Sequence, residues 1–211
     1  MNTSSEDTVL LLHGAWMNSL VMAYLGHALR REGFAAQALG YRTMSDPLEA
    51  HLSRLANRIA RLGASRLHLV GHSLGGVIVL RYLQRVADRR VQRAVLLGAP
   101  VAGCRAAAGL AQRIGGEFMM GQSLAVWREP VDVSVDARFE IGAIAGTRAL
   151  GLGAMVTRLP EPNDGVVCVD ETKFPALRDH LALPVGHTLM LMSSRVARQT
   201  ASFLKTGAFR R

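Results

Sequence analysis

A serine in a glycine-rich turn is the residue in this sequence best suited to chemistry. Ser73 lies in the segment Gly71–Gly75, which reads GHSLG and matches the pattern G-x-S-x-G. Small residues beside the serine allow it to occupy a strained turn between a strand and a helix, where its oxygen is exposed. An apolar run precedes the segment, and a helix is predicted to follow it up to about Val86. We therefore predict that Ser73 is a nucleophile rather than a serine in a glycine-rich helix cap.

A serine hydroxyl needs a base within hydrogen-bond reach, and histidine suits this role. Seven histidines are present, and the chain order serine, acid, histidine expected for a serine turn of this kind leaves only His180 and His187. His187 comes after the last predicted strand and before a helix, at the carboxyl end of the sheet, whereas His180 should open that strand at the opposite end. We predict His187 as the base; its alternative role is that of a helix-capping histidine.

The acid that orients the histidine must lie between these two residues in the sequence, on a loop beyond the carboxyl end of a strand. Asp164 fits best, because its Asn-Asp-Gly turn lies in the long loop 146–172, which follows the predicted strand 139–145. The same turn sequence is also common where no chemistry takes place. The other acids are Asp170 and Glu171, which are the reserves, and Asp132 and Asp136, which precede the strand and should lie at its amino end.

Two backbone N–H groups are predicted to form an oxyanion hole. The first belongs to Leu74, because a helix that starts after the serine directs its positive end at developing negative charge. The second should come from the loop after the first strand, where His13, Gly14 and Ala15 lie. We select the N–H of Ala15, because glycine at position 14 lets the backbone approach the site. The alternative is an ordinary turn between a strand and a helix.

Short apolar runs alternate with longer amphipathic segments, which indicates a parallel sheet with helices on both faces. The helix that begins near residue 46 is expected to have Asp46 as its N-cap and Pro47 as its first residue. Short helices over the strand tips are expected in the region 101–130. The predicted strands are 9–12, 36–39, 66–70, 91–97, 139–145 and 180–184, and the predicted long helices are 19–31, 46–62, 74–86 and 187–204.

The length and composition predict one globular domain. At 211 residues, with 49% hydrophobic and 19% charged residues, the chain suits a single domain 1–211 without a large cap, with 1–7 and 206–211 as flexible ends. Two cysteines, Cys104 and Cys168, argue against a disulfide framework and a zinc site. We expect no metal and no cofactor. The polar start of the chain lacks a secretory signal, so the expected location is cytoplasmic.

The net charge of +9 comes almost entirely from arginine. The arginines are scattered, and no basic run is interleaved with aromatic residues, so nucleic acid is not expected as a partner. A basic surface could attract an anionic membrane, which stays open as a partner. The oligomeric state is not indicated.

Taken together, these residues resemble the α/β-hydrolase superfamily, in particular small lidless bacterial lipases and esterases and lipases related to GPI inositol deacylases. The likeness extends from Val9 to about Leu204. The resemblance implies a minimal α/β-hydrolase fold with about six parallel strands. The motifs that carry it are 12–14 (LHG), 71–76 (GHSLGG), 98–103 (GAPVAG), 163–167 (NDGVV) and 187–188 (HT).

The resemblance also implies an activity: hydrolysis of carboxylic esters through a Ser-His-Asp triad and an acyl-enzyme intermediate. The substrate would be a small-molecule or lipid ester, with an apolar acyl chain. Three alternatives remain open. A thioesterase or acyltransferase would use the same triad, a lyase or cofactor-independent peroxidase would keep the triad but not turn over esters, and a non-catalytic binding protein would be expected to lack a triad member.

Overall fold

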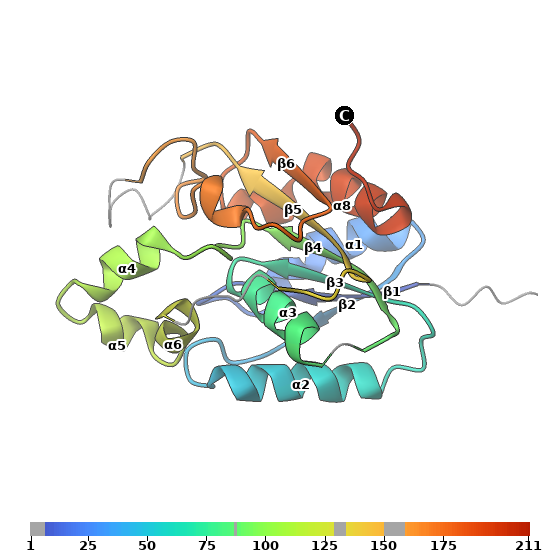
Figure 1. Cartoon of the computed structure of the whole chain (residues 1–211), viewed down its shortest axis with the longest axis horizontal. Helices are drawn as coiled ribbons and strands as arrows, with labels where there is room; N and C mark the ends of the chain where they lie inside the picture. The colour runs from blue at the N-terminus through green and yellow to red at the C-terminus, as the bar shows by residue number, and fades with distance from the viewer. Residues whose placement is uncertain (1–6, 87, 129–133, 150–158) are drawn as a thin grey trace, which may run out of the picture.

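Six parallel strands form one sheet in the order β2-β1-β3-β4-β5-β6 (Figure 1). The computed structural model describes residues 7–86, 88–128, 134–149 and 159–211. The sheet confirms the predicted six-stranded parallel architecture. Its strands are β1 (Thr8–Leu12), β2 (Ala35–Leu39), β3 (Leu67–His72), β4 (Val91–Leu97), β5 (Glu140–Gly146) and β6 (Asp179–Leu183).

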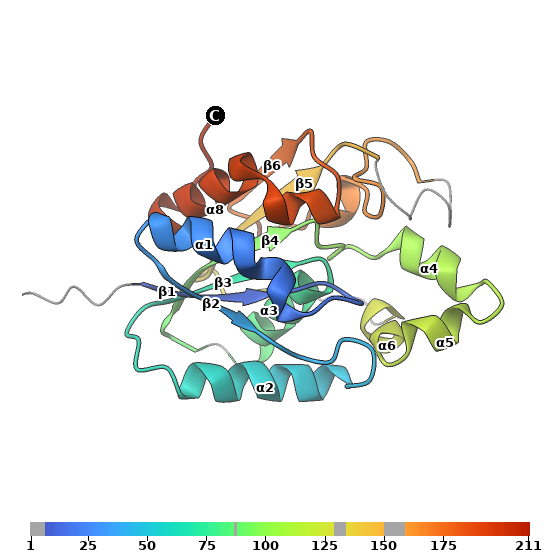
Figure 2. The same cartoon turned by 180° about the vertical axis from the view of Figure 1, so that it is seen from behind.

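The strands read as continuous apolar runs because both faces of the sheet are covered. Successive side chains point to opposite faces, so Leu10 and Leu12 of β1 pack in one apolar core and Val9 and Leu11 in the other. Helices α1 and α8 cover one face, and α2 and α3 cover the other (Figures 1 and 2). These helices are α1 (Ala23–Arg31), α2 (Leu48–Ala60), α3 (Leu74–Arg85) and α8 (Ser194–Thr206).

Two predicted long helices are each divided into a 3-10 turn and an α-helix. The first begins as η1 (Ser19–Met22), where the Asn18 side chain accepts a hydrogen bond from Leu20 N–H. The last begins as η3 (Thr188–Met192), and α8 starts afresh after Ser193. Ser193 has an extended backbone, and its hydroxyl accepts a hydrogen bond from Val196 N–H. A serine N-cap therefore separates the two segments.

The predicted cap of α2 was wrong by one residue. Pro47, not Asp46, is the N-cap, and the helix begins at Leu48. The ψ angle of Pro47 is 164°, which is extended, so its carbonyl accepts the first helical hydrogen bonds while the residue itself stays outside the helix. Apolar residues at helical spacing then face the sheet. They are Leu48, Leu52, Leu55 and Ile59.

The region after β4 forms the expected short helices. They are α4 (Arg105–Ala111), α5 (Gly116–Met120) and α6 (Ser123–Arg128). Both views show α4 and α5 beyond the ends of the strands, with α6 beside the start of α2 (Figures 1 and 2). No helix in the described ranges is long and apolar enough to cross a membrane.

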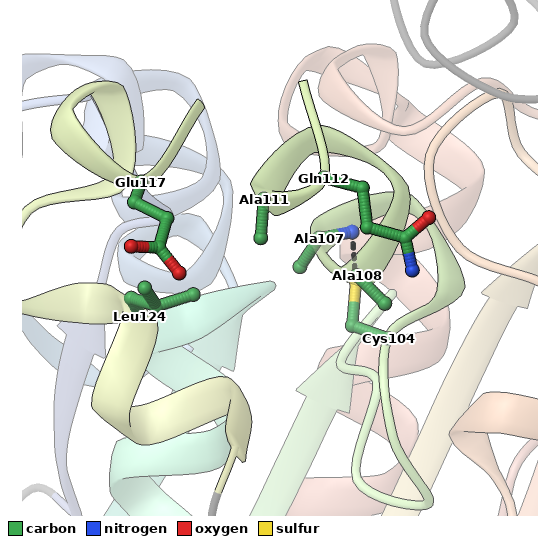
Figure 3. Close-up of a pocket in the computed structure, with 7 residues that line it drawn as sticks. All are labelled: Cys104, Ala107, Ala108, Ala111, Gln112, Glu117 and Leu124. Atoms are coloured by element: carbon green, nitrogen blue, oxygen red, sulfur yellow. Dashed lines mark hydrogen bonds between the residues drawn. The ribbon is translucent and has the colours of Figure 1, made fainter. Parts of the chain in front are cut away.

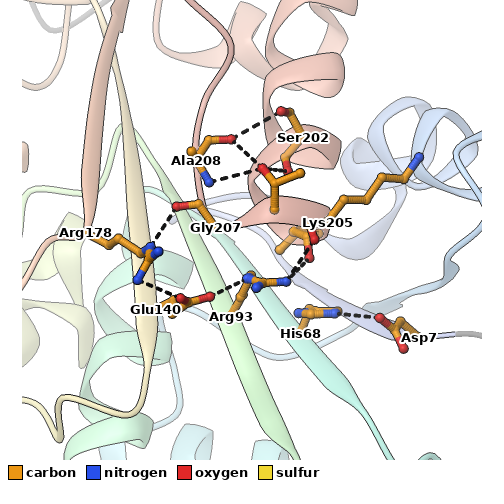
Figure 4. A network of polar contacts seen from close by, with 11 residues as sticks. Asp7, His68, Arg93, Glu140, Arg178, Ser202, Lys205, Gly207 and Ala208 are labelled. Carbon is orange, nitrogen blue, oxygen red and sulfur yellow. Dashed lines mark hydrogen bonds and ion pairs between the residues drawn. The ribbon is translucent and has the colours of Figure 1, made fainter.

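Polar contacts tie the amino end of the sheet to the end of the chain (Figure 4). Glu140 on β5 accepts hydrogen bonds from Arg93 on β4 at 2.5 Å and from Arg178 at 2.7 Å. Arg93 also donates to the Leu204 carbonyl at 3.0 Å, and Arg178 donates to the Gly207 carbonyl at 3.0 Å. These contacts lie at the opposite end of the strands from Ser73, so they stabilise the scaffold without reaching the site.

Residues 206–211, which the sequence predicts to be a flexible end, make several contacts with the domain. Thr206 is the last residue of α8, and the Phe209 ring packs against Phe203 with 5.0 Å between ring centroids. Phe209 N–H also donates to Asp179 at 2.8 Å. Burial of this aromatic ring holds the end of the chain against β6. At the other end, Asp7 pairs with His68 at 3.3 Å, and residues 1–6 lie outside the described part.

Candidate active site

Ser73 occupies a strained turn between β3 and α3. Its φ of 52° and ψ of −120° are rare for a residue with a side chain. Such a conformation costs about 1–3 kcal/mol and persists only when the surroundings hold it. Ser73 N–H donates to the Leu97 carbonyl at 2.9 Å, and the Ser73 carbonyl accepts from Gly76 N–H at 2.9 Å. Strand β4 and helix α3 therefore fix the backbone of this residue.

The glycines of the motif are required by close backbone approach. A Cβ atom on Gly71 would lie 2.4 Å from the Gly75 carbonyl oxygen, and one on Gly75 would lie 2.5 Å from the Leu12 carbonyl oxygen. No side chain fits at either position without movement of the backbone. The turn is thus packed against both its own helix and the end of β1.

Asp164 and His187 are in direct contact. His187 Nδ1 lies 2.7 Å from Asp164 Oδ2, and the other oxygen, Oδ1, accepts from Val166 N–H at 2.9 Å and from Val167 N–H at 2.7 Å. Asp164 is fully buried. Because an ionised carboxylate only accepts hydrogen bonds, Nδ1 of the neutral histidine carries the proton. Nε2 is then the nitrogen free to accept a proton.

Gly98, after β4, lies directly against this pair. Its φ is +54°, and a Cβ atom there would lie 3.1 Å from both Asp164 Oδ2 and His187 Nδ1. Gly98 N–H donates to the Ile144 carbonyl at 2.8 Å, which joins the ends of β4 and β5. A residue without a side chain is needed for the two loops to meet here.

His72 connects the serine turn to the histidine loop. Its Nε2 lies 3.1 Å from the His187 carbonyl oxygen, and the centroids of the two rings are 4.7 Å apart. His72 is fully buried, and burial, together with the neighbouring His187, lowers the pKa of His72 well below its ordinary value. A neutral His72 can donate from Nε2 to that carbonyl. The residue next to Ser73 thereby holds the backbone of His187.

The two expected oxyanion donors lie on segments that meet at the serine. Leu74 is the first residue of α3, where helical N–H groups lack an intrahelical acceptor. The loop after β1 reaches Ser73 at Gly14, where a Cβ atom would lie 3.2 Å from Ser73 Cβ and 2.9 Å from His72 Nδ1. Ala15, the next residue, is on this loop.

The reserve acids lie elsewhere. Glu171 is buried and accepts from Arg105 N–H at 2.6 Å and from Cys168 N–H at 2.7 Å. Asp170 pairs with the Arg105 guanidinium at 2.8 Å, and that hydrogen bond lowers the pKa of the Asp170 carboxyl. Glu171 thus connects α4 to the Asp164 loop, a role that the sequence analysis missed.

The remaining candidates are also accounted for. His180 lies on β6, and its Nε2 is 2.9 Å from the Thr172 hydroxyl. Asp136 pairs with Arg138 at 3.3 Å, ahead of β5. Asp132 lies outside the described residues, as does part of the loop 146–172.

A cavity of about 290 Å³ lies among α4, α5 and α6 (Figure 3). Cys104 at its edge is the N-cap of α4, and its sulfur accepts from Ala107 N–H at 3.4 Å. Burial raises the pKa of the Cys104 thiol to about 12. The cavity lies on the segment that follows β4 and begins at Gly98, the residue that contacts Asp164 and His187. The lining is mainly small and apolar: Cys104, Ala107, Ala108, Ala111, Gln112, Glu117 and Leu124.

Comparisons with known proteins agree with this architecture. The model of the alpha/beta hydrolase family matches residues 9–199. The mature lipase BlEst2 of Bacillus licheniformis is similar in structure, with a TM-score of 0.74 at 16% identity over 98% of this chain and 94% of that chain. Carboxylesterase CesB of Bacillus subtilis gives a TM-score of 0.59 at 18% identity over 98% and 86% of the two chains. No curated protein matches the sequence. At these identities the solved structures establish the fold alone.

Proposed function

Because the chain belongs to the alpha/beta hydrolase family, we propose that it is a serine hydrolase that cleaves carboxylic esters. The observation that carries the proposal is the buried contact of 2.7 Å between Asp164 and His187. The His187 carbonyl in turn contacts His72, the neighbour of a serine held in a strained turn. Two of the similar solved structures, a lipase and a carboxylesterase, support ester chemistry.

In the proposed mechanism, Ser73 Oγ attacks the acyl carbonyl while His187 Nε2 takes its proton. Asp164 keeps the histidine in the tautomer with the proton on Nδ1 and stabilises the imidazolium that forms. The N–H groups of Leu74 and Ala15 donate to the oxyanion of the tetrahedral intermediate. His187 then protonates the leaving alcohol, and a water molecule activated by His187 releases the acid from Ser73.

The distribution of exposed apolar side chains supports an apolar ester as substrate. Among the described residues, nine large hydrophobic side chains are exposed. All except Val86 come from segments that follow the carboxyl ends of β1, β4 and β6, which is the end of the sheet that carries Ser73. The eight residues are Trp16, Leu20, Tyr24, Ile114, Phe118, Met119, Leu189 and Met192.

This distribution and the cavity together suggest where the acyl chain binds. Contiguous exposed apolar patches mark binding sites, and two members of this set, Trp16 and Met119, are in contact. Most residues that line the cavity beside Cys104 are small or apolar, as in sites that bind hydrocarbon chains, and Gln112 and Glu117 add polar groups. We assign the acyl chain to this cavity and the exposed apolar side chains to its approach.

The test is intact-mass labelling with a fluorophosphonate probe, which needs no knowledge of the substrate. Wild-type protein should gain one adduct, and Ser73→Ala should gain none while keeping its circular dichroism spectrum. Ser45→Ala, which changes an exposed serine outside the site, should label like wild type. Folded wild-type protein without an adduct would contradict the proposal.

Turnover is then measured with p-nitrophenyl esters of increasing acyl length and with thioesters of the same acyl groups. Faster turnover of the oxygen esters is expected. A clear preference for thioesters would replace the esterase assignment with a thioesterase that uses the same residues.

A further inference from the structure

Three consecutive peptide groups of the loop after β1 are each held by a side-chain hydrogen bond. The Tyr41 hydroxyl donates to the His13 carbonyl. His13 Nδ1 lies 3.0 Å from the Gly14 carbonyl oxygen, to which it donates. Trp16 N–H donates to the Thr43 hydroxyl at 3.1 Å. Tyr41 and Thr43 both belong to the connection between β2 and α2, so one segment holds both ends of the loop.

These bonds determine which N–H group of the loop is available. In a trans peptide the carbonyl and the N–H point in opposite directions. The Gly14 carbonyl points at the His13 ring, so Ala15 N–H, which belongs to the same peptide, points away from that ring. Trp16 N–H is already occupied by Thr43. Ala15 is therefore left as the N–H beside Gly14 that can serve a ligand.

Trp16 has a backbone conformation that requires such support. Its φ is 56°, and with Ser73 it is one of two non-glycine residues with positive φ among those described. The residue is 59% exposed, so burial does not hold it in place. Two hydrogen bonds do: the one to Thr43, and one from Nε1 to the Met119 carbonyl at 3.1 Å. Strained residues that are held in this way cluster at functional sites.

Tyr41 also supports the loop through its ring. It stacks on the His13 ring with 4.3 Å between centroids and 17° between planes, and His51 contacts it edge-on with 5.0 Å between centroids. Burial raises the pKa of the Tyr41 hydroxyl far above its ordinary value and lowers the pKa of His13. Both groups are therefore neutral near pH 7, and each keeps the proton it donates to the loop.

We propose that Tyr41 and Thr43 are positioning residues that preorganise the oxyanion hole by orienting the peptides on either side of the Gly14–Ala15 peptide, which carries the Ala15 N–H. Neither residue touches the substrate. Tyr41 acts through the His13 carbonyl and ring, and Thr43 acts through Trp16 N–H. This inference rests on the proposed hydrolase function.

The expected effect is on the transition state rather than on substrate binding. Removal of one oxyanion donor in other enzymes lowers kcat by about 10²–10³-fold. When one of these hydrogen bonds is lost, the Ala15 N–H still points at the oxyanion for part of the time. We therefore expect kcat to fall by about 10–100-fold. KM should stay within about 2-fold of wild type, because the ground-state carbonyl depends less on the oxyanion donors than the transition state does.

The experiment compares Tyr41→Phe, Thr43→Val and Thr43→Ser with wild type, using one p-nitrophenyl ester. Tyr41→Phe keeps the stacked ring and removes only the donor. Thr43→Val keeps the shape and removes only the acceptor. Thr43→Ser restores the acceptor, so it should recover most of the lost kcat. Ser45→Ala, on the same connection, is the control and should leave kcat unchanged.

A second measurement separates positioning from a loss of stability. A trifluoromethyl ketone forms a tetrahedral adduct with an active serine. Its inhibition constant should rise by about the same factor as kcat falls. Each assay is run well below the melting temperature of the variant. If Thr43→Val does not fold, Tyr41→Phe, which loses a hydrogen bond to the loop, is compared with Thr43→Ser, which keeps one, in kcat and in ketone affinity.

Two results would overturn the inference while leaving the proposed function intact. One is wild-type kcat in both Tyr41→Phe and Thr43→Val. The other is a fall in activity that Thr43→Ser does not restore and that the ketone affinity does not follow. Absence of both turnover and a Ser73 adduct in the wild type would instead contradict the proposed function, and the inference with it.

Discussion

His187 is joined to Asp164 twice, by the side-chain contact of 2.7 Å between Nδ1 and Oδ2 and by a backbone hydrogen bond of 2.9 Å from His187 N–H to the Asp164 carbonyl. The side-chain contact orients the imidazole ring, and the backbone bond fixes the two loops relative to each other. Because the two functions are separate, a substitution can remove the first and keep the second.

Asp164→Asn makes this separation. The amide oxygen can still accept from Val166 and Val167 N–H, but the NH₂ group then faces His187 Nδ1 and favours the tautomer with the proton on Nε2. That tautomer cannot accept the Ser73 proton, so kcat should fall by about 10⁴-fold with little loss of stability. Ester turnover and thermal unfolding are the measurements. Asp170→Asn, at an exposed ion pair, is the control, and its kcat should stay within about 2-fold of the wild-type value. A similarly small fall in kcat for Asp164→Asn would show that Asp164 is not the acid of the triad.

Gly98→Ala should disturb the same pair by crowding. The new methyl group would lie 3.1 Å from both Asp164 Oδ2 and His187 Nδ1, which is tighter than ordinary packing. We expect kcat to fall by about 10-fold or more, because small displacements of catalytic groups are costly. Gly103→Ala is the matched control: its φ is +110°, but nothing lies within 4 Å of the new atom. That variant should lose stability and keep kcat, and equal kcat values in the two variants would count against crowding.

Glu171→Gln should weaken the fold more than the chemistry. Each carboxylate oxygen accepts one backbone N–H, from Arg105 or Cys168. A glutamine has one oxygen, so one buried N–H loses its acceptor, and the free energy of unfolding should fall by about 1–3 kcal/mol. Urea unfolding measures this. Glu49→Gln, which removes an exposed ion pair with Arg85, should change stability by less than about 1 kcal/mol, and an equally small effect at Glu171 would contradict its structural role.

Stability should decrease in mild acid because of buried histidines. Burial lowers the pKa of His13, His51, His68 and His72 in the folded protein. Unfolded histidines bind protons near pH 6.5, but these folded ones do so only at lower pH, so the unfolded state binds more protons below that pH. The free energy of unfolding should be constant above about pH 7.5 and fall below about pH 6.5. Each such histidine can lower the free energy of unfolding by up to about 1.4 kcal/mol for each pH unit below pH 6.5.

The pH prediction is checked by urea unfolding at pH 7.5, 6.5 and 5.5. His51→Phe preserves an aromatic ring beside Tyr41 and removes one titrating group. It should therefore reduce the slope of the free energy of unfolding against pH by the amount that corresponds to at most one bound proton. A slope of zero in the wild type between pH 6.5 and 5.5 would contradict the prediction.

The sheet was predictable from the sequence because its strands are short, apolar and separated by amphipathic helices. The predicted strand 91–97 coincides with β4, and the other strands shift by one or two residues at their ends. The start of α2 was predicted one residue too early because aspartate is a common N-cap residue type. The extended ψ of Pro47, which makes Pro47 the N-cap, cannot be read from the sequence. Burial of Phe209 against Phe203 likewise gave no periodic signal.

The contacts around the candidate site were less predictable, because they depend on backbone directions and on residues far apart in the chain. Tyr41 and Thr43 each meet a residue that is 27 or 28 positions away. Their types, a tyrosine and a threonine after a weak strand, carry no pattern. Glu171 was considered only as an alternative to Asp164, because its two N–H partners become visible only when the loop is folded.

The helices α4, α5 and α6 contribute little to the two apolar cores. Among the described residues from 104 to 128, only Val126 belongs to either core. The segment is joined to the rest through hydrogen bonds that use its backbone groups, such as the Met119 carbonyl to Trp16, Gln122 N–H to Met44 and Arg105 N–H to Glu171. Mutations there can accumulate without exhausting the stability of the scaffold. A lineage that carries this fold can therefore exchange the segment as a unit and acquire new substrates while Ser73, His187 and Asp164 stay in place.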